Sequence, residues 1–152
     1  MRVRDAMSRN VETIAATVPA HSAISRMVTR KIRHLPVVDT DGTLVGVVTD
    51  RDLRHYLFSP GVFERIGQVS SDDLLKAARV KEVMSSPAIS VRADDDLETA
   101  ARLMVGRKVG SLPVVEDGRV VGIVTETDLL RQIVLTEDAR TPECEAIVVS
   151  FP

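Results

Sequence analysis

The stretch HLPVVDTDGTLVGVVTDRDL at residues 34–53 recurs at residues 111–129 as SLPVVEDGRVVGIVTETDL, with one residue deleted at a turn. More than half of the aligned positions are identical, which indicates an internal structural repeat. The similarity continues more weakly upstream, where DAMS at 5–8 corresponds to EVMS at 82–85. The chain is therefore predicted to contain two copies of one folding unit.

Each copy is predicted to fold as strand, helix, strand, strand and helix. Apolar residues recur at helical spacing before each LPVV run, and Asp-Gly pairs within the repeats predict hairpin turns. The short first strands are expected near residues 13–15 and 89–91, and the closing helices over about 50–57 and 126–135.

The repeat divides the chain into four parts. Repeat 1 is expected at 1–58, a linker with a short helix capped by Ser70 or Ser71 at 59–79, repeat 2 at 80–136 and a tail at 137–152. The tail contains AIVV, either an extra strand or a contact with a partner chain. A three-stranded sheet with helices on one face leaves its other face open. We therefore expect an α+β fold in which the repeats pack sheet to sheet about a pseudo-twofold axis, with equivalent loops around shared clefts.

The composition excludes several classes of partner. The chain of 152 residues is 44% hydrophobic with a net charge of −2, as in a soluble globular protein. Its 3% aromatic content and lack of a long basic run argue against nucleic acid and an anionic membrane surface as partners. A single cysteine, Cys144, and no apolar run of membrane-spanning length favour a cytoplasmic location.

A Thr-x-x-Asp pair stands at the same place in both repeats, as Thr49 with Asp52 and Thr125 with Asp128. The simplest interpretation is a helix N-cap, in which Thr accepts a backbone hydrogen bond and Asp favours the helix dipole. A helix start also offers N–H groups to a phosphate, and a carboxylate can accept bonds from neighbouring hydroxyls. Capping and ligand binding are compatible.

The order PVV, Asp or Glu, a Gly turn, VG-x-VT-x-x-DL, present twice, resembles a tandem pair of CBS domains, also called a Bateman module. The resemblance covers about residues 3–58 and 80–136. It implies a regulatory binding module that is not an enzyme, acts in trans on an unidentified partner protein and forms a homodimer. The ligands it implies are AMP, ADP or ATP, with S-adenosylmethionine or a dinucleotide as further possibilities.

The resemblance also implies two composite sites, each with an adenine pocket from the opposite repeat. Site A is built on the ribose-binding acid Asp52 and site B on Asp128. In site A, ribose and phosphate are expected to meet Thr49, Arg51, Asp52, Arg33 and His34, and adenine to meet Met84, Ala88, Ile89, Val109 and Ser111. In site B the corresponding sets are Thr125, Thr127, Asp128, Gly110 and Ser111, and Met7, Val11, Glu12, Ile32 and His34.

The two sites are predicted to be unequal in charge. Repeat 1 carries Arg33, His34 and Arg51 where repeat 2 carries Gly110, Ser111 and Thr127. Charged donors bind phosphate more strongly than neutral ones, and the guanidinium fork fits phosphate oxygens. Site A is therefore predicted to hold phosphate, and site B to hold adenosine, a ligand without phosphates, or nothing.

Two other functions stay open at this point. The caps alone would suffice for a structural or protein-interaction module without a physiological ligand. An enzyme is less favoured, because the sequence shows no nucleophile–base pair, no metal-ligand cluster and no phosphate-binding P-loop. No catalytic residue and no metal ligand is predicted.

Overall fold

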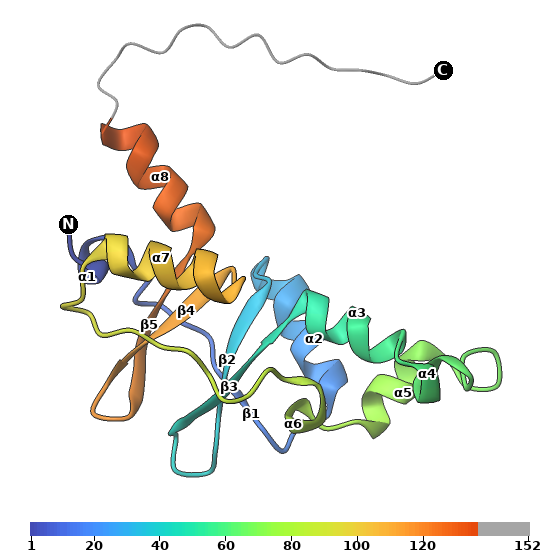
Figure 1. Cartoon of the computed structure of the whole chain (residues 1–152). Coiled ribbons are helices and arrows are strands. Elements are labelled where there is room, and N and C mark those ends of the chain that lie inside the picture. Colours follow the sequence, from blue (N-terminus) through green and yellow to red (C-terminus); the bar gives the residue numbers. More distant parts are fainter. Residues whose placement is uncertain (137–152) are drawn as a thin grey trace, which may run out of the picture.

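A computed structural model describes residues 1–136 as two α+β halves lying side by side (Figure 1). The repeat 1 elements are α1 (Val3–Ala6), β1 (Ile14–Ala15), α2 (Ala20–Arg30), β2 (His34–Val38), β3 (Leu44–Thr49) and α3 (Asp50–Leu57). The repeat 2 elements are α6 (Val80–Val83), α7 (Leu97–Arg107), β4 (Ser111–Glu116), β5 (Arg119–Thr125) and α8 (Glu126–Thr136). The α+β class and the two repeats are as predicted. The AIVV stretch and Cys144 lie outside the described residues.

The repeat 1 sheet has the strand order β1-β2-β3. Strand β1 runs parallel to β2, and β2 pairs with β3 in antiparallel fashion with His34 opposite Thr49. Gly42 in the hairpin turn has a φ of 79°, a left-handed conformation that the Asp-Gly pair supplies without strain. This register brings the end of β3 and the start of β2 to the same edge, where α3 begins.

The repeat 2 sheet has only two named strands, β4 and β5, so the expected strand near 89–91 is much reduced. Val91 alone pairs with β4: its N–H donates to the Pro113 carbonyl at 3.0 Å and its carbonyl accepts from the Val115 N–H at 2.9 Å. Ile89 instead packs at the edge of the second core. The sequence pattern predicted the position of this segment correctly, but it predicted a longer paired strand than the structure shows.

Each half has its own hydrophobic core, and each core is completed by a short helix from the other repeat. Val80 and Val83 of α6 belong to the core formed by α2, β2 and β3, whereas Val3 of α1 belongs to the core under α7 and β4. Backbone hydrogen bonds hold both short helices in these positions. The Lys81 N–H donates to the Ala16 carbonyl, and the Arg4 N–H donates to the Ala93 carbonyl. The repeats are consecutive in sequence, but their packing is interleaved.

Equivalent contacts on the two sides show the pseudo-twofold relation of the repeats. Ser85, just after α6, exchanges two backbone bonds of 2.9 and 3.1 Å with Val47 on β3. Ser8, just after α1, exchanges two of 2.9 and 3.0 Å with Ile123 on β5. The two hairpin turns lie on the same side of the molecule (Figure 1), and Arg119 of one donates to the Asp41 carbonyl of the other.

The linker contains two helices, α4 (Pro60–Phe63) and α5 (Ser71–Ala77). Ser70 caps α5, because its hydroxyl accepts a bond of 3.2 Å from the Asp73 N–H. The helix ends at Ala77, and Arg79 already caps the start of α6. Among residues 1–136, no helix has both the length and the apolar character needed to cross a membrane.

Candidate functional site

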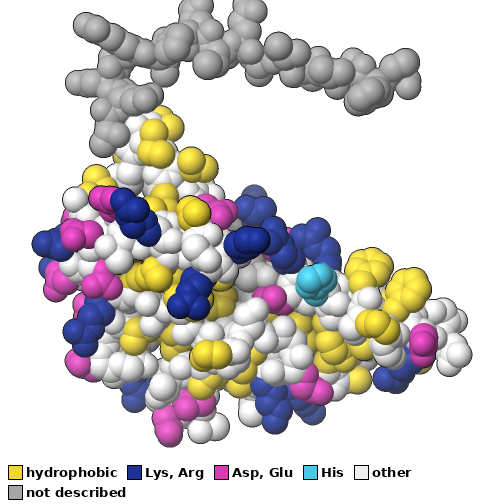
Figure 2. Space-filling view, in the orientation of Figure 1, with side chains coloured by type: hydrophobic (Ala, Val, Ile, Leu, Met, Phe, Trp, Pro, Cys, Tyr) yellow, Lys and Arg dark blue, Asp and Glu magenta, His cyan; other side chains and the backbone are white. Residues whose placement is uncertain are grey.

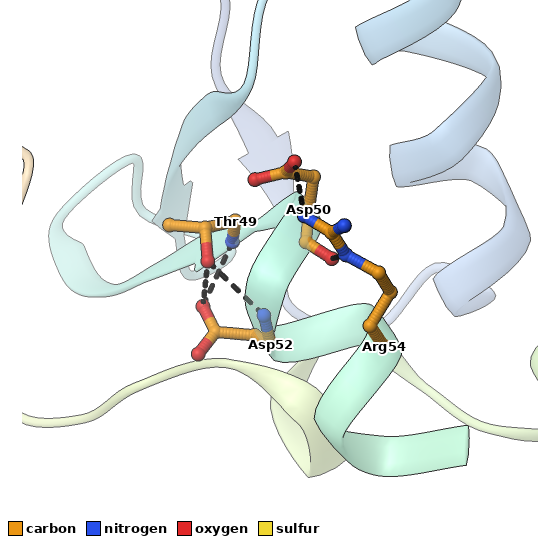
Figure 3. A network of polar contacts seen from close by, with 4 residues as sticks. All are labelled: Thr49, Asp50, Asp52 and Arg54. Carbon is orange, nitrogen blue, oxygen red and sulfur yellow. Dashed lines mark hydrogen bonds and ion pairs between the residues drawn. The ribbon is translucent and has the colours of Figure 1, made fainter. Parts of the chain in front are cut away.

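The Thr-x-x-Asp pairs form closed capping boxes at the start of α3 and α8. In repeat 1 the Thr49 N–H and hydroxyl each donate to Asp52 Oδ2 at 2.8 Å, and the Asp52 N–H donates to Thr49 Oγ1 at 3.1 Å (Figure 3). Thr125 and Asp128 repeat the arrangement, with the two bonds to Asp128 Oδ2 at 2.9 and 2.7 Å. The capping interpretation is therefore confirmed in both repeats.

Capping uses only one oxygen of each carboxylate. The Ser85 hydroxyl donates to Asp52 Oδ1 at 3.2 Å, and Arg131 Nη1 lies 3.5 Å from Asp128 Oδ1. Each carboxylate lines a cleft together with that neighbour. The cap thus fixes the orientation of the side chain and leaves its second oxygen as an acceptor at the cleft wall.

A cleft of about 290 Å³ opens at the start of α3. Every residue predicted for site A lines it except Met84. Met84 packs behind the wall instead: a Cβ added to Gly46 would lie within 2.5 Å of its sulfur. The wall of the site A cleft consists of Arg33, His34, Val47, Thr49, Asp50, Arg51, Asp52, Ser85, Pro87, Ala88, Ile89, Lys108, Val109, Gly110, Ser111 and Glu126.

A second cleft, of about 610 Å³, opens at the start of α8. The residues predicted for site B line it except Met7 and Ser111. Met7 packs against Gly122 as Met84 does against Gly46, and Ser111 is buried at the site A cleft. The wall of the site B cleft consists of Ser8, Asn10, Val11, Glu12, Arg30, Lys31, Ile32, Arg33, His34, Gly110, Ile123, Thr125, Glu126, Thr127, Asp128 and Arg131.

Sequence reasoning missed several basic residues that line the clefts. Lys108 at site A and Lys31 at site B are equivalent: each ends its helix in the left-handed conformation, with φ of 54° and 55°. Arg131 follows Asp128 by nearly one turn of α8. For the two lysines, the sequence offered one signal, the predicted end of the helix. The residue at that end turns the chain toward the cleft.

The predicted difference in charge between the sites rested on too few residues. Site B is lined by Arg30, Lys31, Arg33 and Arg131, of which Arg30 pairs with Glu12 at 3.0 Å. Both clefts therefore contain cations, and Arg33 belongs to both. In the space-filling view, Lys and Arg side chains gather where α7 ends and α3 begins (Figure 2). The preference of phosphate for site A stays a prediction.

The first backbone N–H of each helix is already bonded to a carbonyl just before β2 or β4. The Asp50 N–H donates to the Arg33 carbonyl at 3.2 Å, and the Glu126 N–H donates to the Gly110 carbonyl at 3.1 Å. With the third amide of each turn bonded to the capping Thr, these contacts leave the Arg51 and Thr127 N–H groups for a ligand. Free amides at a helix start are well suited to bind an anion.

His34 stands between the two clefts and is largely withdrawn from solvent. Its Nδ1 is buried and makes no hydrogen bond within residues 1–136. Burial lowers the pKa of His34 below its usual value, Arg33 lowers it further, and the carboxylates of Asp50, Glu126 and Asp52 oppose the shift. The imidazole is therefore neutral at neutral pH. No cluster of three or more His, Cys, Asp and Glu that could hold a metal occurs in the described part of the chain.

Comparison with known proteins agrees with this architecture. A CBS domain protein of Dictyostelium discoideum is 33% identical over 93% of this chain and 97% of its own length. An inosine-5′-monophosphate dehydrogenase of Methanocaldococcus jannaschii is 30% identical over 93% of this chain, which spans only 25% of that enzyme.

Two solved structures are similar over nearly their whole length. The CBS domain pair of the protein MJ0100, in complex with 5′-methylthioadenosine and S-adenosyl-L-methionine, has a TM-score of 0.69 and 27% identity, covering 88% of this chain and 99% of its own. The protein CBSX2 in complex with AMP has a TM-score of 0.72 and 29% identity, covering 90% and 98%. The sequence matches the CBS domain twice, at residues 3–59 and 80–135, and the chain belongs to the CBS domain family.

Proposed function

We propose that this chain is a regulatory module that binds an adenosine-containing nucleotide, with the main site in the site A cleft. The observation that carries the proposal is the Asp52 carboxylate, held by its cap with Oδ1 left at the cleft wall. Relatives of this size that resemble the chain throughout were solved with AMP or with S-adenosyl-L-methionine. AMP, ADP and ATP are the candidate ligands.

The chemistry of the wall divides the cleft into three parts. Asp52 Oδ1 can accept hydrogen bonds from the two neighbouring ribose hydroxyls. Val47, Ala88, Ile89 and Val109 provide an apolar surface for a base, consistent with the mostly apolar lining of small-molecule sites.

The remaining part of the wall is basic. Arg33, Arg51 and Lys108 line the cleft around the start of α3, where the Arg51 N–H is left without a backbone partner by the cap. Charge-assisted bonds from these groups are roughly twice as strong as neutral ones. This set favours a ligand with phosphate over S-adenosylmethionine, which has none.

Binding would regulate a partner protein in trans, and the module would work as a cytoplasmic homodimer without catalytic activity of its own. A ligand shifts a conformational equilibrium only through a difference in affinity for the two states. The interleaved helices α1 and α6 supply a route, because each joins one cleft-forming half to the core of the other.

The test is isothermal titration of AMP and ATP into the wild type and Asp52→Ala. Loss of a charged hydrogen-bond partner removes about 1.5–3 kcal/mol, so affinity should fall roughly 10- to 100-fold. The control is Asp73→Ala, which removes a similar hydroxyl-to-carboxylate bond at the start of α5, outside both clefts, where Ser70 Oγ donates to Asp73 Oδ2 at 2.7 Å. That variant should bind as the wild type does.

Equal affinity in wild type and Asp52→Ala, with both proteins folded by circular dichroism, would contradict the site assignment. Absence of AMP or ATP binding to the wild type would contradict the proposed function itself. It would favour a module that acts through protein contacts alone.

A further inference from the structure

The two clefts share part of their wall. Arg33 and His34 from the start of β2, and Gly110 and Glu126 from repeat 2, line both site A and site B. The clefts therefore meet at one junction, and a charge placed there acts on both.

The junction is asymmetric because repeat 2 has a glycine where repeat 1 has Arg33. A Cβ at Gly110 would lie 3.3 Å from His34 Cε1 and 3.4 Å from Glu126 Oε2. The imidazole and the carboxylate thus both approach the bare backbone of Gly110, from β2 and from α8. One histidine, without a counterpart in repeat 2, occupies the space that separates the sites.

His34 is surrounded by groups that respond to charge. The charged neighbours that face it are Arg33, which precedes it in the chain, Asp50 and Asp52 on α3, and Glu126 on α8. Its buried Nδ1 has no hydrogen-bond partner in the part of the chain that the structure describes. An unpaired buried polar atom raises the free energy of the native state. The imidazole thus lies among groups of both signs at the wall of both clefts.

We propose that His34 takes up a proton when a phosphorylated ligand enters either cleft, so that one imidazole links nucleotide binding in both clefts to pH. The unprotonated nitrogen of the neutral ring accepts a proton from solvent. A ring N–H then donates to a phosphate oxygen, and no other bond forms or breaks. The inference rests on the proposed function and adds the regulation of its site.

The sign of the effect follows from the environment. Burial and Arg33 lower the pKa of His34, so the imidazole is neutral at neutral pH. A phosphate dianion beside the ring raises that pKa and favours the charged form. Between the two pKa values, affinity rises as pH falls, by at most about tenfold per pH unit for one linked proton. Adenosine, which has no phosphate, should show no such dependence.

The experiment measures protons exchanged on binding, by titrating ATP at about pH 6.5 in buffers of different ionisation enthalpy. The phosphate group itself titrates with a pKa of about 6, so wild type is compared with His34→Asn. We expect the wild type to take up more protons per bound ATP than His34→Asn does, by a difference that approaches one proton. The control His55→Asn removes an exposed imidazole outside both clefts and should match the wild type.

Sharing between the clefts is tested in single-site backgrounds. Asp128→Ala retains the site A acid, and Asp52→Ala retains the site B acid. His34→Asn should reduce proton uptake in both backgrounds. Equal uptake with and without His34 would overturn the proposal, and an effect in one background alone would overturn the shared role. A wild type that does not bind ATP at all would overturn the proposed function as well. This outcome is recognised because the titration then shows no heat of binding.

Discussion

Gly46 and Gly122 are the residues that let the segments after α6 and α1 lie against β3 and β5. A Cβ at Gly46 would lie 2.5 Å from the Met84 sulfur and 2.8 Å from the Ser85 carbonyl oxygen. The sulfur can move, but the carbonyl oxygen belongs to a backbone fixed by two hydrogen bonds to Val47. The glycine is therefore required for close approach, and a larger residue must displace the wall of the site A cleft.

Gly46→Ala should lower the free energy of unfolding by about 1–3 kcal/mol, as overpacking does in a rigid site. The matched control is Gly106→Ala within α7, where an added Cβ meets nothing within 4 Å. Alanine favours a helix over glycine by up to about 1 kcal/mol, so this variant should gain stability. Urea denaturation of both variants gives the comparison. Equal or greater stability of Gly46→Ala would contradict the packing argument.

Prediction from sequence at this scale succeeded where a residue acts locally. Thr49 and Asp52 lie three apart, and the capping box follows from that spacing alone. Lys108 and Arg131 were missed because their place at a cleft depends on how the chain leaves one helix and how the other helix is oriented. Met7 and Met84 were placed at adenine, but they fill the space left by glycines on the strands of the other repeat.

At the scale of elements, α5 shows how a linker becomes part of the fold. Leu74 and Leu75 are buried, and α5 packs against α2 beside the repeat 1 core. A helix of seven residues has little stability alone, so its cap and its apolar contacts must hold it. The sequence indicated the cap, but α4 and the separation of α5 from α6 depend on tertiary contacts.

Ser70→Ala removes the hydroxyl that caps α5 and should lower the free energy of unfolding by about 1 kcal/mol. Ser70→Asp, which also accepts the Asp73 N–H, should retain most of the stability. Ser90→Ala, at an exposed position outside the helices and strands, serves as the reference for the loss of a hydroxyl. Thermal unfolding of the four proteins tests this, and equal melting of Ser70→Ala and wild type would show that the cap contributes nothing.

At the scale of the whole molecule, the exchange of α1 and α6 makes the two cores interdependent. Val3 and Val80 are both fully buried. Val3 of repeat 1 lies in the core of the repeat 2 half, and Val80 of repeat 2 lies in the core of the repeat 1 half. The repeat in the sequence predicted two similar halves. It could not predict the exchange, because a short helix before each repeat packs equally well by pattern into either core.

Val3→Ala and Val80→Ala should each lower stability by about 2 kcal/mol, through lost burial and the cavity that remains. Because each short helix ties one half to the other, both variants should shift a single calorimetric transition that covers the whole fold. Differential scanning calorimetry at matched concentrations distinguishes the outcomes. Two separate transitions, with each variant moving only one, would show that the halves unfold independently.

The interleaving of α1 and α6 has a consequence for synthesis on the ribosome. The core of the first half needs Val80 and Val83, so it closes only after α6 has left the exit tunnel. Helix α1 is translated before either sheet, yet its Val3 has no core to enter until α7 and β4 have been made. The earliest helix of the described chain is thus among the last to be buried, and it stays exposed to chaperones and proteases until those elements have emerged.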